Sequence, residues 1–174
     1  MFLGTFDAAS FNVTLSASGS VVNSSTTSVR SIAVGSGTWT IAGSGTAWST
    51  ATSTNLTVTG TGTITFTSVS AKTFAGGGIS YTNITLNQGG AGTLTITGNN
   101  TFKDITNTYK ATGATNITMG TTTQRVSQWT AAGEAGRLLT IQGTSASSPC
   151  TLIHTGTGTA ANVDYLVVTG VRAY

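Results

Sequence analysis

The sequence predicts an all-β fold, and more specifically a right-handed parallel β-solenoid (β-helix) that occupies residues 1–174 as one domain. Polar and apolar residues alternate through most of the chain, which is the pattern of strands with one buried face. Turn-forming glycines recur between these short runs, and charged residues make up only 6% of the chain. Helical periodicity is nearly absent, so repeated units of turn plus strand are expected to build the core.

The clearest alternation marks four short strands, in which Thr or Asn points outward and an aliphatic residue or Phe points inward. They are residues 55–59, 63–67, 93–97 and 116–119. Thr suits the outward positions because its β-branch favours an extended backbone and its hydroxyl group stays hydrated. Further strands are expected around nine aliphatic residues: Val13, Ile32, Ile41, Ile84, Ile105, Val126, Leu139, Leu152 and Leu166.

The tetrad Gly-x-Gly-Thr recurs along the chain, and most copies lead directly into an expected strand. Two glycines allow backbone angles that other residues resist, after which the chain can become extended again. Each tetrad is therefore predicted to form a corner. The copies are residues 35–38, 43–46, 60–63, 90–93 and 156–159.

Repeats of turn plus strand without helices form either a solenoid or an antiparallel sandwich or barrel. Strands separated by a few small residues suit coils that stack on their predecessors, with two or three strands in each coil. A low charge also suits a stack, because like charges would otherwise line up in ladders. One coil alone buries too little, so the stability would come from stacking. An antiparallel β-sandwich is the alternative.

Two stretches depart from the simple alternation. The apolar parity changes from odd to even positions within residues 79–86, and a β-bulge or corner at Thr82–Asn83 would account for the change. The pattern is weakest between Gly120 and Leu139, where residues 133–136 are expected to form an exposed loop.

The charge pattern argues against nucleic acid as a partner. The net charge of +3 comes from seven cations that are scattered along the chain, whereas a nucleic-acid site gathers Lys and Arg on one face. No apolar run is long enough to insert into a membrane, and the first residues lack the features of a secretory signal. The single cysteine, Cys150, excludes an intrachain disulfide and is expected to pack as a small apolar residue.

No catalytic, metal-binding or cofactor-binding residues are expected, so the chain is predicted not to be an enzyme. The four acidic residues, Asp7, Asp104, Glu134 and Asp164, are far apart in the sequence, although stacking could bring two of them together. His154 is the single histidine, lacks the partners of a zinc site, and is expected to point outward from a strand. The glycine tetrads lack the Lys-Ser/Thr pair or third glycine of phosphate-binding loops.

Aromatic residues are the remaining candidates for ligand contact, because sugar rings stack on exposed Trp and Tyr. Trp39 alternates with Ile41 and is expected in the core. Packing in the core is the alternative for each of the others as well. The four candidate ligand-contact residues are Trp48, Tyr81, Tyr109 and Trp129.

Residues 89–102, GGAGTLTITGNNTF, resemble the strand repeat of bacterial autotransporter passengers, which form right-handed parallel β-helices. A broader likeness extends from about Trp39 to Val168. Over this range the chain resembles β-solenoid proteins of marine tailed bacteriophages, whose roles are structural or fibre-like. The segments that carry this resemblance are residues 73–79, 99–105, 120–126, 135–141 and 163–166.

The resemblance implies a non-enzymatic structural or adhesive module of a phage appendage such as a tail fibre, in the virion or on an extracellular surface. Self-association, side by side or end to end, would follow from unpaired strand edges at the solenoid ends. Other virion proteins and host surface glycans are further expected partners. The alternative is a passenger segment of an autotransporter-like bacterial adhesin, although the secretory signal and membrane barrel of a complete autotransporter are missing from the sequence.

A third hypothesis is ice binding, because flat solenoid faces with regular Thr ladders can bind ice. Thr-x-Thr pairs occur at Thr57 and Thr59, and in two later strands at residues 63–65 and 93–95. Their irregular spacing in the sequence favours the simpler explanation that outward Thr suits a strand.

Overall fold

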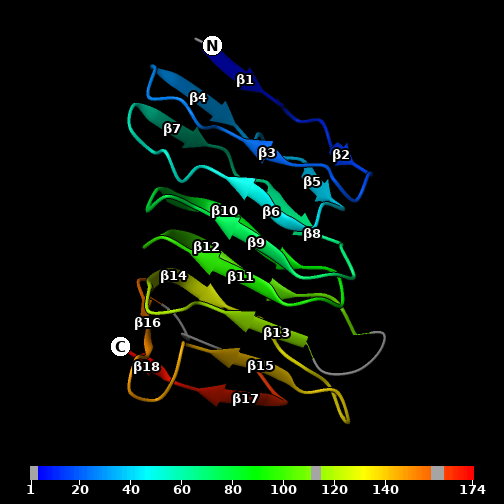
Figure 1. The fold of residues 1–174 in the computed structure, drawn as a ribbon, viewed down its shortest axis with the longest axis vertical. Helices are drawn as coiled ribbons and strands as arrows, with labels where there is room; N and C mark the ends of the chain where they lie inside the picture. Colours follow the sequence, from blue (N-terminus) through cyan, green and yellow to red (C-terminus); the bar gives the residue numbers. More distant parts are fainter. Residues whose placement is uncertain (1–3, 111–114, 158–162) are drawn as a thin grey trace.

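A computed structural model describes residues 4–110, 115–157 and 163–174, which contain strands, turns and loops but no helix. The strands wind into a β-solenoid of about six turns. Figure 1 shows the coils stacked along the long axis of the molecule, with the N-terminal coil at the top and the C-terminal coil at the bottom. The prediction of an all-β solenoid is confirmed.

Three sheets form the sides of the solenoid. Sheet A contains β1 (Gly4–Asp7), β4 (Arg30–Ala33) and β7 (Leu56–Thr59). Sheet B contains β2 (Val13–Leu15), β5 (Thr38–Ile41), β8 (Thr63–Phe66), β10 (Ser80–Gln88), β12 (Thr101–Asn107), β14 (Thr123–Trp129), β16 (Cys150–His154) and β18 (Val171–Ala173). Sheet C contains β3 (Val22–Asn23), β6 (Gly45–Ser49), β9 (Lys72–Ala75), β11 (Leu94–Thr97), β13 (Thr115–Thr118), β15 (Leu139–Gln142) and β17 (Leu166–Thr169).

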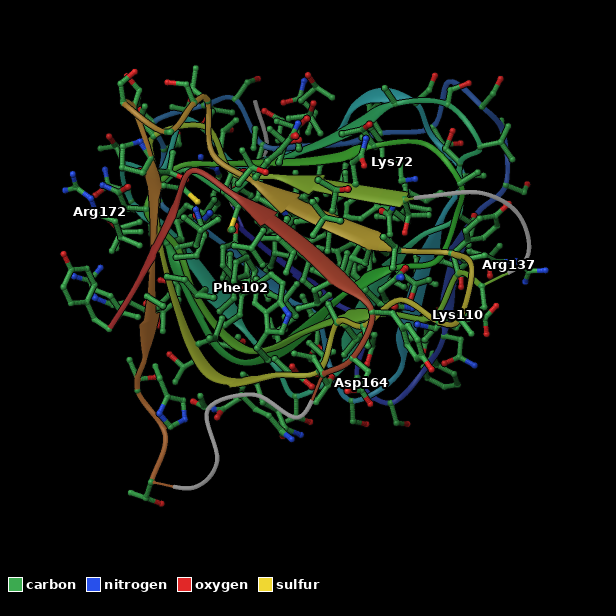
Figure 2. All side chains as sticks on the ribbon, turned by 90° about the horizontal axis from the view of Figure 1, so that it is seen from below. Lys72, Phe102, Lys110, Arg137, Asp164 and Arg172 are labelled. Carbon is green, nitrogen blue, oxygen red and sulfur yellow. The ribbon has the colours of Figure 1, made fainter. Side chains whose placement is uncertain are left out.

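All paired strands among the described residues run parallel, so the antiparallel sandwich is wrong. Figure 2 looks along the axis from the C-terminal end. In that view the chain passes anticlockwise through β16, β17 and β18 as it advances toward the viewer, which is the sense of a right-handed coil. Right-handed crossovers are also the general rule for parallel strands.

The long strands β10, β12 and β14 each cover two sides of the solenoid. Their C-terminal halves continue the ladder of β2, β5 and β8, since Thr85–Gln88 pairs with β8. Their N-terminal halves pair with one another and, through β14, with β16 and then β18. Because β7 contacts β10, these halves, together with β16 and β18, extend the side that sheet A begins. We call this continuous side the A side.

Inward residues stack in columns from coil to coil. Parallel pairing in register places like residues above one another, and here it aligns aliphatic and aromatic side chains. Burying each such side chain contributes roughly 1.5–3 kcal/mol. One column in sheet B consists of Val13, Trp39, Ile64, Leu86, Ile105 and Trp129.

Aromatic rings fill the middle of the core. Phe74 stacks on Trp48 with the ring centroids 5.8 Å apart, and it meets Tyr81 edge to face at 5.1 Å. Phe66 and Phe102 complete the group around Phe74, at 6.3 Å and 5.4 Å. Figure 2 shows Phe102 inside the coil. Phe74 therefore joins neighbouring coils into one apolar interior.

The glycine tetrads form tight corners where backbone lies on backbone. A Cβ atom on Gly37 would lie 2.3 Å from the carbonyl oxygen of Phe11, and one on Gly62 would lie 2.2 Å from that of Gly37. Neither distance can accommodate a side chain, so glycine is required by the approach of successive coils. The corner prediction is confirmed for the first four copies, while part of residues 156–159 lies outside the described residues.

The predicted strands are all present, with boundaries shifted by a residue or so. The predicted bulge is confirmed, because the register of β10 with β12 shifts between Tyr81 and Thr85 and both Thr82 and Asn83 are exposed. The expected loop at residues 133–136 is a tight turn with Ala135 and Gly136 exposed. The sequence prediction did not include β1, β3, β6, β9 and β18.

Candidate functional site

Two of the four candidate aromatic residues, Trp48 and Tyr81, are completely buried. The Tyr81 hydroxyl group lies 2.6 Å from Thr50 Oγ1 and donates to the carbonyl oxygen of Gly76 at 3.1 Å. The indole Nε1 of Trp48 donates to the same hydroxyl group at 3.4 Å. Burial raises the pKa of Tyr81 to about 12. Both rings are fully packed, so the structure corrects their assignment as ligand contacts.

Trp129 is also a core residue, 2% exposed, and its Nε1 donates to the carbonyl oxygen of Ala131 at 3.0 Å. It stacks below Ile105 in the inward column of sheet B. Tyr109 alone among the four candidates keeps a half-exposed side chain, just after β12. Trp39, Cys150 and their neighbours in the core lie buried as predicted.

Asp104 and Glu134, two of the four acidic residues, each bind other groups of the chain. The register partners of Asp104 are Thr85 and Gln128, and its carboxylate accepts hydrogen bonds from Thr130 N at 3.0 Å and Thr130 Oγ1 at 2.6 Å. Desolvation raises the pKa of Asp104, and the hydrogen bonds from Thr130 oppose this rise. Glu134 is paired instead with Arg137, at 2.7 Å. Asp104 is thus a strand residue that secures the next coil.

His154 is half-buried at the end of β16, with its Nε2 atom 3.0 Å from the carbonyl oxygen of Ser127. Among the residues that the structure describes, no group of three or more His, Cys, Asp or Glu side chains could hold a metal ion.

The sequence analysis missed two buried cations that bind backbone carbonyls. Lys72 is 1% exposed, and its Nζ donates to the carbonyl oxygens of Ser68 at 2.9 Å, Gly90 at 3.2 Å and Gly92 at 2.6 Å. Desolvation lowers the pKa of Lys72 to about 8. The side-chain amide of Gln88 donates to the same two glycine carbonyls. The signal was available, because Lys72 alternates with the inward residue Phe74.

Arg30 also binds backbone carbonyl oxygens, at another corner of the solenoid. Its guanidinium group donates to the carbonyl oxygens of Ser28 and Thr54, each at 2.9 Å, and to Ser24 Oγ at 2.6 Å. These contacts join the corner before β4 to the corner before β7 in the next coil. Both cations are fully used by the fold, so neither is available to a ligand.

A regular ladder of threonines runs along the outside of sheet C. Successive members are direct register partners in β6, β9, β11, β13, β15 and β17, which Figure 1 shows lying one below another. The Gln142 side chain fits the ladder by donating to Thr118 Oγ1 at 3.1 Å. The outward positions of these six strands carry no charged residue. The members of the ladder are Thr46, Thr73, Thr95, Thr118, Gln142 and Thr169.

The two ends of the solenoid are hollow and apolar. The hollow at the N-terminal end has a volume of about 600 Å³ and is lined by Phe6, Val13, Leu15, Val22 and Trp39 among others. The hollow at the C-terminal end has a volume of about 200 Å³, and its lining includes Leu166, Val168, Val171 and Tyr174. These are the inward surfaces of the first and last coils that the structure describes.

No protein-family model, curated protein or solved structure matches this chain. The resemblance to phage solenoids and autotransporter repeats therefore remains a prediction. The described residues include no helix with the length and apolar character needed to cross a lipid bilayer.

Proposed function

We propose that the chain is a structural module, a stiff segment of a fibre-like virion appendage that links or extends other parts of the assembly. The observation that carries this proposal is the continuous stack itself. Phe74 and its aromatic neighbours tie adjacent coils together, and corner glycines bring successive backbones into direct contact. A stack of this kind resists bending because each coil is held by its two neighbours.

Several described charged groups are occupied in holding coils together. Lys72, Arg30 and Asp104 all bind groups on neighbouring segments of the chain. This use of polar side chains supports a structural role. The location in a virion rests on the resemblance to phage solenoids alone.

Immunogold electron microscopy of the native particles tests the location. An antibody raised against the recombinant chain should label the appendages of intact virions, and antibody pre-absorbed with the chain should not. Labelling of the surface of uninfected cells would instead support the bacterial adhesin. Absence of label from the appendages would contradict the proposal.

Binding of host surface glycans is a secondary part of this proposal, and it now depends on Tyr109. A glycan array should show binding that falls when Tyr109 is replaced by Ala. Tyr174→Ala is the matched control, because Tyr174 is an exposed tyrosine at the end of the chain. Equal binding by both variants would remove Tyr109 as a sugar contact.

Ice binding is a second candidate function, and the ladder on sheet C favours it. The threonines are irregularly spaced in the sequence because the corners between their strands differ in length. In the structure the register of the strands aligns them. Strands in a sheet are spaced about 4.8 Å apart, so the ladder presents methyl and hydroxyl groups at a constant interval on an uncharged face. Such an array could order water in a repeating pattern. The Thr pairs in β7, β8 and β11 lie on three different sides and do not form one array.

Thermal hysteresis measured at high protein concentration tests this candidate. Thr95→Lys places a charge in the middle of the ladder and should abolish most of the activity. Thr57→Lys makes the same change on the outside of sheet A and should leave the activity unchanged. No hysteresis in the wild-type chain, or equal loss in both variants, would eliminate the ladder as an ice-binding surface.

A further inference from the structure

The inward columns of the solenoid stop abruptly at both ends. Phe6 belongs to the column of Ile32 and Val58 but is 53% exposed, because none of the described residues forms a coil above β1. Val168 belongs to the column of Ile141 and is 55% exposed, because no coil in the described part of the chain lies below β17. Both side chains thus have a neighbouring coil on one side only, whereas the equivalent residues of the inner coils have one on each side.

The two ends also leave strand edges that match in direction. The A side begins at β1 and ends at β18, and sheet C begins at β3 and ends at β17. All of these strands run parallel to their neighbours. The edge strands at one end could therefore form the same parallel hydrogen-bond ladder with the edge strands at the other end. Unpaired edges of this kind are templates for pairing with another chain.

We propose that a second copy of this chain is the occupant, with the C-terminal end of one copy stacked on the N-terminal end of the next. The β18 edge would continue into β1, and the β17 edge into β3. Apolar residues around Val168 would then cover the hollow beside Phe6. This inference rests on the proposed structural role, since it names the partner through which the module extends a fibre.

Charge complementarity favours this arrangement. Asp7 is the charged residue of β1, and Arg172 is the charged residue of β18. Both are exposed and lie on the outward positions of the A side, where their register partners are Ala33 and Thr151. Figure 2 shows the Arg172 side chain pointing away from the coil. Stacking of successive copies would bring the two opposite charges to the same seam.

The contact is heterologous, because each end binds a different surface. Such contacts add further copies without limit unless the rotation between copies closes a ring. Sedimentation velocity of the 174-residue chain should therefore show a series of species that lengthens with concentration. Electron micrographs of the same samples should show rods with the width of one solenoid.

Two blocked variants test the polarity of the contact. Phe6→Lys places a charge in the N-terminal hollow, and Val168→Lys places one on the C-terminal end, so each variant alone should be monomeric. A mixture of the two should form dimers and nothing longer, because only one compatible pair of ends remains. Val69→Lys is the matched control on an exposed valine in a loop between β8 and β9, and it should assemble like the wild type.

Charge reversal provides a second, independent test with milder changes. Asp7→Arg or Arg172→Glu should weaken association about tenfold, as expected for loss of a favourable charge pair. A chain that carries both reversals restores the opposite charges at every seam and should recover association. Circular dichroism of each variant checks that the solenoid is intact.

A wild-type chain that remains monomeric at all concentrations would overturn the inference, and so would a mixture of blocked variants that does not dimerise. Assembly that is lost in Val69→Lys but kept in the end variants would also overturn it, because it would indicate side-by-side contacts. None of these results bears on immunogold labelling of the appendage, so failure of the stacking model is distinguishable from failure of the proposed function.

Discussion

Replacing Gly62 by Ala tests whether direct backbone contact between coils is a source of stability. The new Cβ atom would lie 2.2 Å from the carbonyl oxygen of Gly37, about an ångström closer than a tolerable contact. The two coils must therefore separate locally at this corner. That shift strains the hydrogen bonds from Thr61 N and Gly62 N to the carbonyl oxygen of Gly35, now 2.7 and 2.9 Å, and from Thr63 N to that of Gly37, now 3.2 Å.

The expected loss of stability follows from these contacts. Overpacking costs about 1–3 kcal/mol, and each weakened backbone hydrogen bond adds up to about 1 kcal/mol. We expect Gly62→Ala to lower the free energy of unfolding by about 2–4 kcal/mol. For a chain of this length the melting temperature should fall by roughly 5–15 °C.

Urea and thermal unfolding, followed by circular dichroism, measure the effect, with Gly19→Ala as the matched control. A Cβ atom on Gly19 meets nothing within 4 Å, so that variant should be unchanged or more stable by about 0.4–1 kcal/mol. Long repeat arrays can unfold in parts, so hydrogen exchange of Thr61–Thr63 should show the local opening even if the global transition is broad. Equal unfolding curves for Gly62→Ala and Gly19→Ala would refute the argument that these corners require glycine.

Two further changes probe the core and the buried cation. Phe74→Ala should lower the free energy of unfolding, measured in denaturant, by about 3–5 kcal/mol. Phe11→Ala removes a highly exposed ring and should lower it by no more than about 0.5 kcal/mol. Similar losses in the two variants would contradict the central role of Phe74. Because the pKa of Lys72 is lowered to about 8, stability should rise as the pH increases from 8 toward 10.5, where the folded chain releases a proton that the unfolded chain keeps. The full linkage between pH 8 and 10.5 would be about 3 kcal/mol, and about 2 kcal/mol of it falls below pH 9.5. Unfolding measured between pH 7.5 and 9.5, below the titration of Tyr81, should show this rise in the wild type but not in Lys72→Met; an equal slope in both would refute it.

The sequence predicted the strands well where one residue in two is apolar, because that periodicity is a direct consequence of a half-buried strand. It failed where the period is interrupted. In β6 the register shifts between Thr46 and Trp48, so that Ala47 and Trp48 are both buried. In β10 the bulge after Tyr81, which the parity change predicted, leaves Thr82 and Asn83 both exposed. These irregularities explain why the positions of Trp48 and Tyr81 could not be assigned from alternation.

The strands that the sequence analysis missed had a different cause. In β9 an inward position carries Lys72, which hides the apolar pattern, and β3 contains only Val22 and Asn23. The Thr ladder on sheet C was equally hidden. Whether its members align depends on how many residues each corner contains. That number is known only from the register between the coils.

The buried cations explain how a chain with so few charges closes its corners. A sharp turn between two sides leaves carbonyl oxygens that no strand can satisfy, and leaving such groups unpaired costs about 1–3 kcal/mol each. Lys72 supplies hydrogen bonds to three of these oxygens, and Arg30 does so at another turn. Since carbonyl groups carry only partial charges, a neutral donor could serve almost as well, and Gln88 already shares two acceptors with Lys72. Desolvation of the buried ammonium group lowers the pKa of Lys72, even though three carbonyl dipoles surround it.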